Sequence, residues 1–586
     1  MFQSKSNLIA VLIVAGAVAL AVFSVYGDSL TSDELSHIPA GYSYLTQQDM
    51  RINPEHPPLI KDFAAMPLLF ENLKIDINHS SWTNEINGQW NFGRHFMYEI
   101  GNNPDAIVFS ARLAILIIFI LLCWIVYTWA KEKYGEKMGL IVLTLTALSP
   151  NILAHARYVT TDVGAALGFV LATYYFIKFV NQPSAKNILW AGLSFGLAQL
   201  LKFSLILLIP LYGFTLLVYL IAQKISNSQF GWGKFFNYIG KSLVLLIIGF
   251  ILIWPVYQFN IWHYPPERQK HDTETILAGY SFKPAAQLVI RMTEKPLLRP
   301  YAQYVLGLLM VFQRTGGGNT TYYLGDVAAT AWKSYFPVVY LLKETLPVLI
   351  LELIALVLAI RSVLKSKKRP NRLSNWIANN FAEFTWLSFI FIYWASSING
   401  NLNIGIRHVL PTFPFFYLLT AGQIQKWLKR SAGLLAKTAK GFLVSILLVW
   451  LVVETISIYP YYLAYFNELA GGPVNGYKYA VDSNLDWGQD LKRLKGFMDQ
   501  NKIEKIRLDY FGGGDPKYYL GDKYERLDSG NLSQRTGWLA VSATFLQNGR
   551  GQAAKGYSQD TTFYNWLNKY EPVTKIGYSI FVYKID

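Results

Sequence analysis

The sequence predicts an α-helical polytopic membrane protein with a small α/β domain at its C-terminal end. Of its 586 residues, 52% are hydrophobic, and the mean hydropathy is +0.24, which is unusual for a soluble chain of this length. We count about eleven apolar segments near the ~17–25 residues that a helix needs to span a bilayer. They cover 8–26, 107–130, 138–155, 161–180, 187–201, 203–223, 240–258, 335–360, 382–397, 405–425 and 441–459.

The basic residues are distributed as in a membrane protein whose N-terminus is cytoplasmic. The net charge is +16, and most of the excess Lys and Arg falls in segments between alternate spans, including the run 365–372. Positive residues favour the cytoplasmic side of a membrane. This pattern predicts a multi-pass protein of the plasma (inner) membrane, with no nucleic acid partner. Three segments are expected on the other side, namely 27–106 (the first long loop), 259–334 (the second long loop) and 461–586.

We therefore divide the chain into a transmembrane module, 1–460, and an extracytoplasmic α/β domain, 461–586. Gly, Asn, Asp and Lys become frequent after Pro460, as in a domain that faces water. Alternation of apolar and polar residues predicts strands there. The expected strands are 505–510, 538–545 and 580–583, and the expected helices are 485–499 and 561–568.

Three carboxylates follow the last apolar segment at fourfold spacing, namely Asp482, Asp486 and Asp490. On a helix, residues four apart lie on one face. We expect a helix here that docks the C-terminal domain onto the membrane module, and a direct catalytic role is the alternative. The rest of the domain is expected to hold or screen an acceptor.

Two adjacent carboxylates, Asp33 and Glu34, stand at the start of the first long loop. Charge at the edge of a membrane is costly and usually marks a functional site. A carboxylate can take a proton from a hydroxyl or an amine, so we assign Asp33 as a general base. Glu34 would orient the site or cap a helix. The alternative for the pair is a helix N-cap, because Ser32-Asp33 precedes a helical pattern.

A second polar cluster, Glu55-His56-Pro57-Pro58, lies later in the same loop. Proline is tolerated in the first turn of a helix. The segment from Leu59 to Phe70 mixes apolar residues with Lys61 and Asp62, which suits helices lying in the membrane interface. A loop packed on the bundle is the alternative.

Positive charge is scarce at the span ends that face the first long loop. Arg157, Lys202 and Arg407 are the basic residues of the short turns there. Arginine binds phosphate through paired hydrogen bonds and lysine through a point charge, so these residues are candidates for binding a donor phosphate. We add Lys61 and His408 to this set. The alternative is contact with lipid headgroups.

Glu55 and His56 are candidate ligands of a divalent metal ion (Zn, Mn or Mg), because carboxylate and imidazole groups suit such ions. Asp162 and His263 are further candidates, for the metal or for an acceptor. Hydrogen bonding without a metal is the alternative for the histidines, and an N-cap role is the alternative for Asp162.

Several motifs follow one another along the chain. They are Asp33-Glu34, Glu55-His56-Pro57-Pro58-Leu59, Ser110-Ala111-Arg112-Leu113, Gly196 to Lys202, Gly316 to Asp326, Tyr335-Phe336-Pro337, Leu342 to Pro347, Gly405 to Pro411 and Tyr465 to Asp490. Their order and spacing over residues 1 to about 495 resemble the GT-C superfamily of polyprenyl-phosphate-sugar glycosyltransferases, of the protein O-mannosyltransferase and lipid A aminoarabinose transferase type. The last motif resembles a bacterial branch. Leu201 is a departure, because the family carries threonine there.

The resemblance implies an enzyme with a GT-C-like fold. It would move a hexose or pentose, with inversion, from a polyprenyl-phosphate donor to a lipid, protein or glycan acceptor on the outer face of the membrane, where Asp33 matches the family's first acid. Two alternatives stay open, namely a polytopic transporter or lipid flippase, and a non-catalytic assembly factor with a GT-C fold. A transporter would need neither the acid pair nor a long loop with interfacial helices. The sugar and the acceptor are not visible in the sequence.

Overall fold

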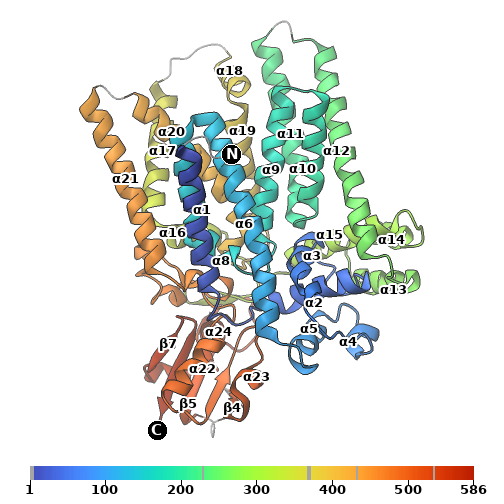
Figure 1. Ribbon diagram of the computed structural model, residues 1–586, viewed down its shortest axis with the longest axis vertical. Helices are drawn as coiled ribbons and strands as arrows, with labels where there is room; N and C mark the ends of the chain where they lie inside the picture. Colours follow the sequence, from blue (N-terminus) through green and yellow to red (C-terminus); the bar gives the residue numbers. More distant parts are fainter. Residues whose placement is uncertain (1–4, 228–229, 366–370, 431–432, 529, 532–534) are drawn as a thin grey trace.

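The protein consists of a bundle of long helices with short helices and a sheet at one end (Figure 1). The computed structural model describes residues 5–227, 230–365, 371–430, 433–528, 530–531 and 535–586. Part of the basic run 365–372 therefore lies outside the described residues. Both the first long loop and the C-terminal sheet lie at the same end of the bundle, which is the lower end in Figure 1.

The bundle confirms the predicted polytopic fold. In the described part of the chain, eight helices are long and apolar enough to span a membrane. They are α1 (Lys5–Ser24), α6 (Pro104–Tyr134), α9 (Asp162–Asn181), α11 with the turn before it (Phe203–Ser226), α12 (Trp232–Asn260), α17 (Leu346–Lys365), α19 (Phe381–Asn399) and α21 (Leu434–Ser457).

The number of spans differs from the predicted eleven, although helices occupy all eleven segments. Two are short, since α10 (Ala185–Gln199) has 15 residues and α20 (Phe413–Lys429) has 17. A ninth candidate span is the pair α7 (Glu136–Ala147) and α8 (Pro150–Ala156), bent by 62°. The bend has a local cause. Pro150 has no N–H with which to continue α7, and Ser149 starts a new helix by accepting a hydrogen bond from the Ile152 N–H.

The apolar core lies at the centre of the bundle, around α9. The apolar window of α9 is 83% buried, against 22% for α1 and 17% for α12. Aromatic rings pack against this helix, and Phe169 lies 4.5 Å from Phe389 between ring centroids. The first residue of this central helix is Asp162, so the core fixes the position of that carboxylate.

Short helices fill the first long loop, as the sequence predicted. They are α2 (Glu34–Gln47), α3 (Leu59–Ala65), η1 (Met66–Phe70), α4 (Ser80–Thr83), α5 (Gln89–Arg94) and η2 (His95–Glu99). Pro67 coincides with the change from α to 3₁₀ geometry in the segment 59–70. Met66, Leu69 and Phe70 are exposed there, with Phe70 at 92%. An exposed apolar face beside the bundle suits a helix at the membrane interface.

The second long loop forms three helices and a hairpin. These are α13 (Pro266–Leu277), α14 (Lys283–Thr293), α15 (Arg299–Gly317), β1 (Thr321–Tyr323) and β2 (Asp326–Ala328). Strand β2 pairs with β6 (Gln552–Ala553) in the C-terminal region, which ties the loop to that region. Helix α16 (Tyr335–Lys343) then leads into the span α17.

The C-terminal region carries a five-stranded mixed sheet of order β4-β3-β5-β8-β7. The strands are β3 (Ile506–Asp509), β4 (Tyr524–Arg526), β5 (Gly537–Ser542), β7 (Thr574–Ile576) and β8 (Ile580–Ile585), and helices α22 (Leu491–Gln500), α23 (Pro516–Leu520) and α24 (Ala543–Asn548) accompany them. The three predicted strands are present, but the one predicted at 538–545 ends at Ser542, where helix α24 follows. The helix predicted at 485–499 begins only at Leu491, and the one at 561–568 is a 3₁₀ turn, Asn565–Lys569.

Residues 481–490, which we call the strap, are not the predicted helix. A 3₁₀ turn, Asp482–Asn484, is followed by further turns and bends up to Asp490, so the three carboxylates do not share a helical face. The strap runs beside the start of the first long loop. The Ser29 N–H donates to the Gln489 carbonyl at 2.8 Å, and the Ser32 N–H donates to the Trp487 carbonyl at 3.1 Å. The backbone of the strap therefore holds the segment that leads into Asp33.

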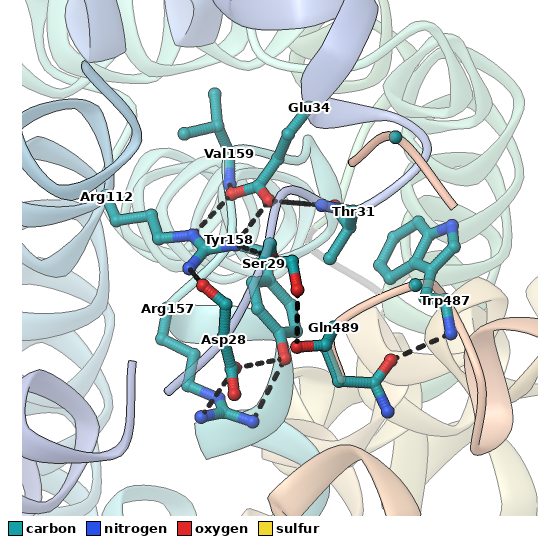
Figure 2. Close-up of polar contacts among 12 residues, drawn as sticks. Asp28, Ser29, Thr31, Glu34, Arg112, Arg157, Tyr158, Val159, Trp487 and Gln489 are labelled. Carbon is teal, nitrogen blue, oxygen red and sulfur yellow. Dashed lines mark hydrogen bonds and ion pairs between the residues drawn. The ribbon is translucent and has the colours of Figure 1, made fainter. Parts of the chain in front are cut away.

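A buried ion pair between Glu34 and Arg112, a residue of α6, also holds the segment that leads into Asp33 (Figure 2). Glu34 accepts hydrogen bonds from Arg112 Nε at 2.8 Å and Nη2 at 2.6 Å, and from the N–H groups of Thr31 and Val159. Neither side chain is more than 3% exposed. Removing one member of a buried pair leaves an unpaired charge and costs about 3–5 kcal/mol.

A second pair, Asp28 with Arg157, is packed beside the first (Figure 2). Arg157 Nη1 lies 3.0 Å from Asp28 Oδ2, and the Tyr158 hydroxyl donates to the same oxygen at 2.7 Å. Arg493, from α22, reaches the other oxygen of Asp28 at 2.6 Å. This network therefore joins the first span, the turn before α9 and the C-terminal region.

We expect the variant Glu34→Gln to lose about 3–5 kcal/mol of unfolding free energy, because Arg112 would stay buried without its counter-charge. Thermal unfolding of the detergent-purified protein, followed by tryptophan fluorescence, measures the loss. Glu504→Gln is the matched control, since Glu504 is exposed and should change stability by less than about 0.5 kcal/mol. Equal unfolding temperatures for the two variants would contradict this role of the pair.

Candidate active site

Asp33 is the last residue before α2, and its carboxylate is aimed away from that helix. It occupies the N-cap position but makes no side-chain capping hydrogen bond. Its Oδ2 instead accepts a hydrogen bond from Arg407 Nη1 at 2.7 Å. The side chain is 24% exposed, whereas Glu34 beside it is fully buried. The two neighbouring acids therefore differ in role, and only Asp33 is open to a ligand.

Asp162 and Lys202 complete the charged cluster. Lys202 Nζ lies 2.6 Å from Asp162 Oδ1, and Arg407 Nη1 lies 3.6 Å from Asp162 Oδ2. The Thr161 side chain makes no capping hydrogen bond at the start of α9. Asp162 is the first residue of this helix, and its carboxylate contacts Lys202 and Arg407. The structure thus brings together four of the sequence-predicted residues, Asp33, Asp162, Lys202 and Arg407. We call them the charged cluster.

The charges in the cluster set the protonation of Asp33. Burial by itself would raise the pKa of the Asp33 carboxyl. The positive charge of Arg407, together with the hydrogen bond that Arg407 donates to the carboxylate, outweighs this effect and holds the pKa below its ordinary value. Asp33 is therefore an ionised carboxylate near neutral pH and can accept a proton.

Three histidines surround the cluster without adding charge to it. Burial lowers the pKa of His37 and lowers that of His56 further, and their rings lie 5.1 Å apart. His408 stacks on Phe336, and burial lowers its pKa to about 3. Because these imidazoles are neutral near pH 7, the positive charge of the site comes from Arg407 and Lys202. His408 can offer a phosphate only a hydrogen bond.

Two predicted phosphate-binding residues lie in structural networks instead. Arg157 is 1% exposed and is held by Asp28, Tyr158 and the Ser24 carbonyl. Lys61 is fully buried, and its Nζ donates to oxygens of Tyr44, Asn53 and His56. Neither side chain reaches the charged cluster by a contact, so both position the chain around the site.

The candidate metal ligands do not gather into a metal site. Within the described residues, no group of three or more His, Cys, Asp or Glu side chains is arranged to hold an ion. Glu55 accepts from Gln89 at 3.3 Å and lies 3.8 Å from Arg314, while His263 is exposed. The arrangement of these residues does not fit the predicted divalent ion.

Two buried polar atoms near the cluster make no hydrogen bond among the described residues. They are Asp162 Oδ2, which has only the longer ion-pair contact with Arg407, and His56 Nδ1. A buried polar atom without a hydrogen bond costs stability unless a ligand or water satisfies it. Asp162 Oδ2 lies at Arg407, and the charge of Lys202 acts on His56, so these atoms mark a place where a polar ligand would be stabilised.

The strap brings further side chains to Arg407, and two of them, Ser483 and Trp487, were not candidates from the sequence. The Arg407 guanidinium lies 4.2 Å from the centroid of the Trp487 ring, and Arg407 Nε donates to Ser483 Oγ at 3.1 Å. Asp482 acts on Arg407 and Asp33 by its charge. The motif Asp482 to Asp490 was visible in the sequence, but its proximity to Arg407 depends on long-range packing.

The strap approaches the 3₁₀ turn that carries Arg407, η4 (Ile406–His408), which we call the Arg407 turn. This close approach requires glycine at position 405. Gly405 has φ +109°, and a Cβ added there would lie 2.5 Å from Ser483 Oγ. The Ile406 N–H donates to Asn484 Oδ1 at 2.9 Å across the same gap. A side chain at position 405 would collide with the Ser483 side chain, so glycine allows the strap to pack this closely on the turn.

Part of the chain resembles a known protein family. Residues 95–254 match the family model of the dolichyl-phosphate-mannose-protein mannosyltransferases. The chain is similar to this mannosyltransferase family. The match begins near the end of the first long loop and includes Arg112, Asp162 and Lys202, and it confirms the resemblance given by the motifs.

The chain also aligns with solved structures of low sequence identity. No curated protein matches the chain. The S. cerevisiae protein O-mannosyltransferase Pmt1-Pmt2 complex bound to the sugar donor aligns with 16% identity and a TM-score of 0.32, over 45% of this chain and 34% of that chain. The chain thus spans about a third of the length of that structure. ArnT from Cupriavidus metallidurans aligns with 11% identity over 99% of this chain and 98% of that chain, with a TM-score of 0.32 in the apo state and 0.31 bound to undecaprenyl phosphate.

We expect Gly405→Ala to destabilise the protein by about 1–3 kcal/mol more than a control glycine variant, because its Cβ overpacks the strap. Gly135→Ala is the control, since Gly135 has a similar backbone conformation (φ +87° and ψ 171°, against φ +109° and ψ 168° at Gly405) but has open space around its Cβ position. Both variants bear the strain of an alanine in a backbone region that only glycine adopts readily. Thermal unfolding measures the difference, and equal losses would show that the strap does not pack tightly on the Arg407 turn.

Proposed function

We propose that this protein is a membrane glycosyltransferase that moves a sugar from a polyprenyl-phosphate donor to an acceptor, with inversion and with Asp33 as the general base. The observation that carries the proposal is the arrangement of Asp33 and Asp162 around Arg407 and Lys202. A polyprenyl-phosphate sugar already contains a good leaving group. Transfer then needs a base for the acceptor and cations for the departing phosphate, and the cluster holds both.

Arg407 and Lys202 are the groups that would bind the donor phosphate. Arg407 is 11% exposed and Lys202 is 16% exposed, so both can be reached although water is scarce around them. In such an environment a charge contact is stronger than in water. In the absence of donor, Arg407 is paired with Asp33 and Asp162, and Lys202 is paired with Asp162. A bound phosphate would share Arg407 with Asp33.

Donor binding would also activate the base. The pKa of Asp33 is held low chiefly by Arg407. A phosphate that takes up part of the positive charge of Arg407 would raise the pKa of Asp33 towards neutral pH, where a general base is most effective. The enzyme would then have a strong base only when the donor is in place, which limits loss of the sugar to water.

The reaction follows from these positions. Asp33 takes the proton of the acceptor hydroxyl or amine while the acceptor atom attacks the anomeric carbon of the sugar. The bond from this carbon to the phosphate oxygen breaks on the opposite face, and the electron pair leaves with the phosphate. Arg407 and Lys202 stabilise the charge that develops on the phosphate. One displacement inverts the configuration, and Asp33 then passes its proton to water.

The distribution of charge supports a site on the outer side of the membrane. The last turns of α6, α11, α17 and α20 carry lysines at the end of the bundle away from the sheet. Basic loops favour the cytoplasm. In this orientation Asp33, the strap and the C-terminal sheet are extracytoplasmic.

The donor can be identified in cells that lack the protein. An unused lipid-linked sugar should accumulate there, and mass spectrometry of lipid extracts would reveal its sugar. Adding the purified protein and membranes from the same cells to that lipid should consume it. No accumulation, or no consumption of the lipid, would reject the proposed function.

We expect Asp33→Asn to reduce sugar transfer by ~10²–10⁴-fold, the usual contribution of a general base, while the protein folds normally because the volume is unchanged. Cells that carry this variant should accumulate the same lipid-linked sugar as cells without the protein. Asp522→Asn is the control, since Asp522 is exposed in the C-terminal region. Transfer by Asp33→Asn at the wild-type rate would remove Asp33 from the mechanism.

The pH dependence of transfer tests the link between Arg407 and Asp33. In Arg407→Gln the acidic limb of the pH profile of kcat/KM, which reports groups of the free enzyme, should move to higher pH. The direction follows because a carboxylate that loses a neighbouring positive charge is protonated more readily. His37 and Arg314 still face Asp33 in the variant. Arg526→Gln, an exposed arginine, should leave the limb in place, and an unmoved limb in Arg407→Gln would contradict the assignment of Asp33.

A further inference from the structure

Asp482 differs from the other two carboxylates of the strap. Asp486 is fully buried and accepts a hydrogen bond from the Thr544 N–H at 2.8 Å. Asp490 is fully buried and is bound by Arg493 and Ser579. Asp482 is partly exposed, and within the described residues no basic side chain forms a salt bridge with it. Asp486 and Asp490 thus fix the strap to the C-terminal region. Asp482 Oδ1 accepts a hydrogen bond from the Ser483 N–H, and among the described residues its Oδ2 has no hydrogen bond or ion pair.

The backbone of Asp482 is held in an unusual conformation by the C-terminal region. Its φ is +54°, in the left-handed region that residues other than glycine rarely adopt. The Asp482 N–H donates to Thr544 Oγ1 at 3.1 Å, and its carbonyl accepts from the N–H groups of Leu485 and Asp486 at 2.8 Å. Such strain persists only where surrounding structure imposes it, and it often marks a functional site.

The strained residue lies next to the charged cluster. Ser483, its neighbour, binds Arg407 Nε, and the charges of Arg407, Asp33 and Arg314 all act on the Asp482 carboxyl. Burial raises the pKa of Asp482 to about 6, although Arg407 lowers it. The group is therefore mostly ionised at neutral pH and can accept a hydrogen bond.

We propose that Asp482 forms the acceptor subsite, where its carboxylate accepts a hydrogen bond from the acceptor's hydroxyl group and aligns that group between Asp33 and the sugar. The inference rests on the proposed function. It assigns to the C-terminal region a direct part in the site, because the strap delivers the residue and Thr544 fixes its conformation. Asp482 is a positioning residue, and the proton still passes to Asp33.

The charge of Asp482 separates the two substrates. A phosphate is repelled by a carboxylate and is attracted to Arg407 and Lys202, so the donor has no reason to approach the strap. A neutral hydroxyl gains a charge-assisted hydrogen bond from the same carboxylate. The acceptor would enter from the side of the C-terminal sheet and the donor from the side of the bundle. Each would meet the site at groups of suitable charge.

The test uses Asp482→Asn, because asparagine tolerates a left-handed backbone and keeps the shape of the side chain. The full-length protein is given the lipid-linked sugar that accumulates in cells lacking the protein, radiolabelled in the sugar. Membranes from those cells supply the acceptor in increasing amount. We expect the apparent KM for acceptor membranes to rise about ten- to a hundredfold, while release of the sugar to water changes less than about twofold.

Two further variants make the outcome decisive. Asp482→Gly removes the carboxylate and relieves the strain, so it should show the same rise in KM if the carboxylate matters. Asp560→Asn, in an exposed part of the C-terminal region, should behave as wild type. An unchanged KM in both Asp482 variants would overturn the acceptor subsite. An equal loss of transfer and of release to water would overturn it too, because Asp482 would then act on the donor. Failure of the wild-type protein in both reactions would instead reject the proposed function.

Discussion

The buried ion pair between Glu34 and Arg112 is the constraint on which the rest of the site depends. Both charges are removed from water, so each is stable only in the position where the other neutralises it. The backbone N–H groups of Thr31 and Val159 complete the hydrogen bonding of the carboxylate (Figure 2). Asp33 is the residue before Glu34, so the pair that fixes one acid also sets the position and direction of the next.

The charged cluster is balanced in a way that suits a reaction with an anionic leaving group. Arg407 contacts Asp33 and Asp162, and Lys202 contacts Asp162. In the absence of donor, each cation thus has an acid partner, which limits the cost of holding charges in a poorly hydrated place. A phosphate can take the place of a carboxylate at these cations, and the released carboxylate becomes a better base. Binding and activation would then be two results of the same exchange.

The site is assembled by parts of the chain that are far apart in the sequence. Ser29 bonds to Gln489 across 460 positions, and Arg407 stacks on Trp487. The spans alone therefore do not complete the cluster, because the strap holds both the Asp33 segment and the Arg407 turn. The C-terminal region is joined to this strap through Asp486 and Asp490. Closing such distant contacts has a cost in chain entropy that grows only slowly with loop length.

The sequence by itself determined the membrane fold, because apolar length and the placement of Lys and Arg are local properties. It also marked Asp33, Asp162, Lys202 and Arg407, since charged residues at span ends are few and costly. Tertiary structure decided how these residues are used. Arg157, Lys202 and Arg407 look alike in the sequence, yet Arg157 is bound by Asp28 inside the protein while the other two face Asp33 or Asp162.

The strap shows most clearly that local sequence did not determine how these residues are arranged. Fourfold spacing predicted a helix through Asp482, Asp486 and Asp490, but the strap is a series of turns and bends. Its hydrogen bonds to Thr544, Ser29 and Arg407 hold it in this irregular path. Local propensity is weak compared with such long-range contacts. The positive φ of Asp482 has no sequence signal, because the surrounding structure imposes it. Only the folded protein decides that this carboxylate lies beside Arg407 and Asp33.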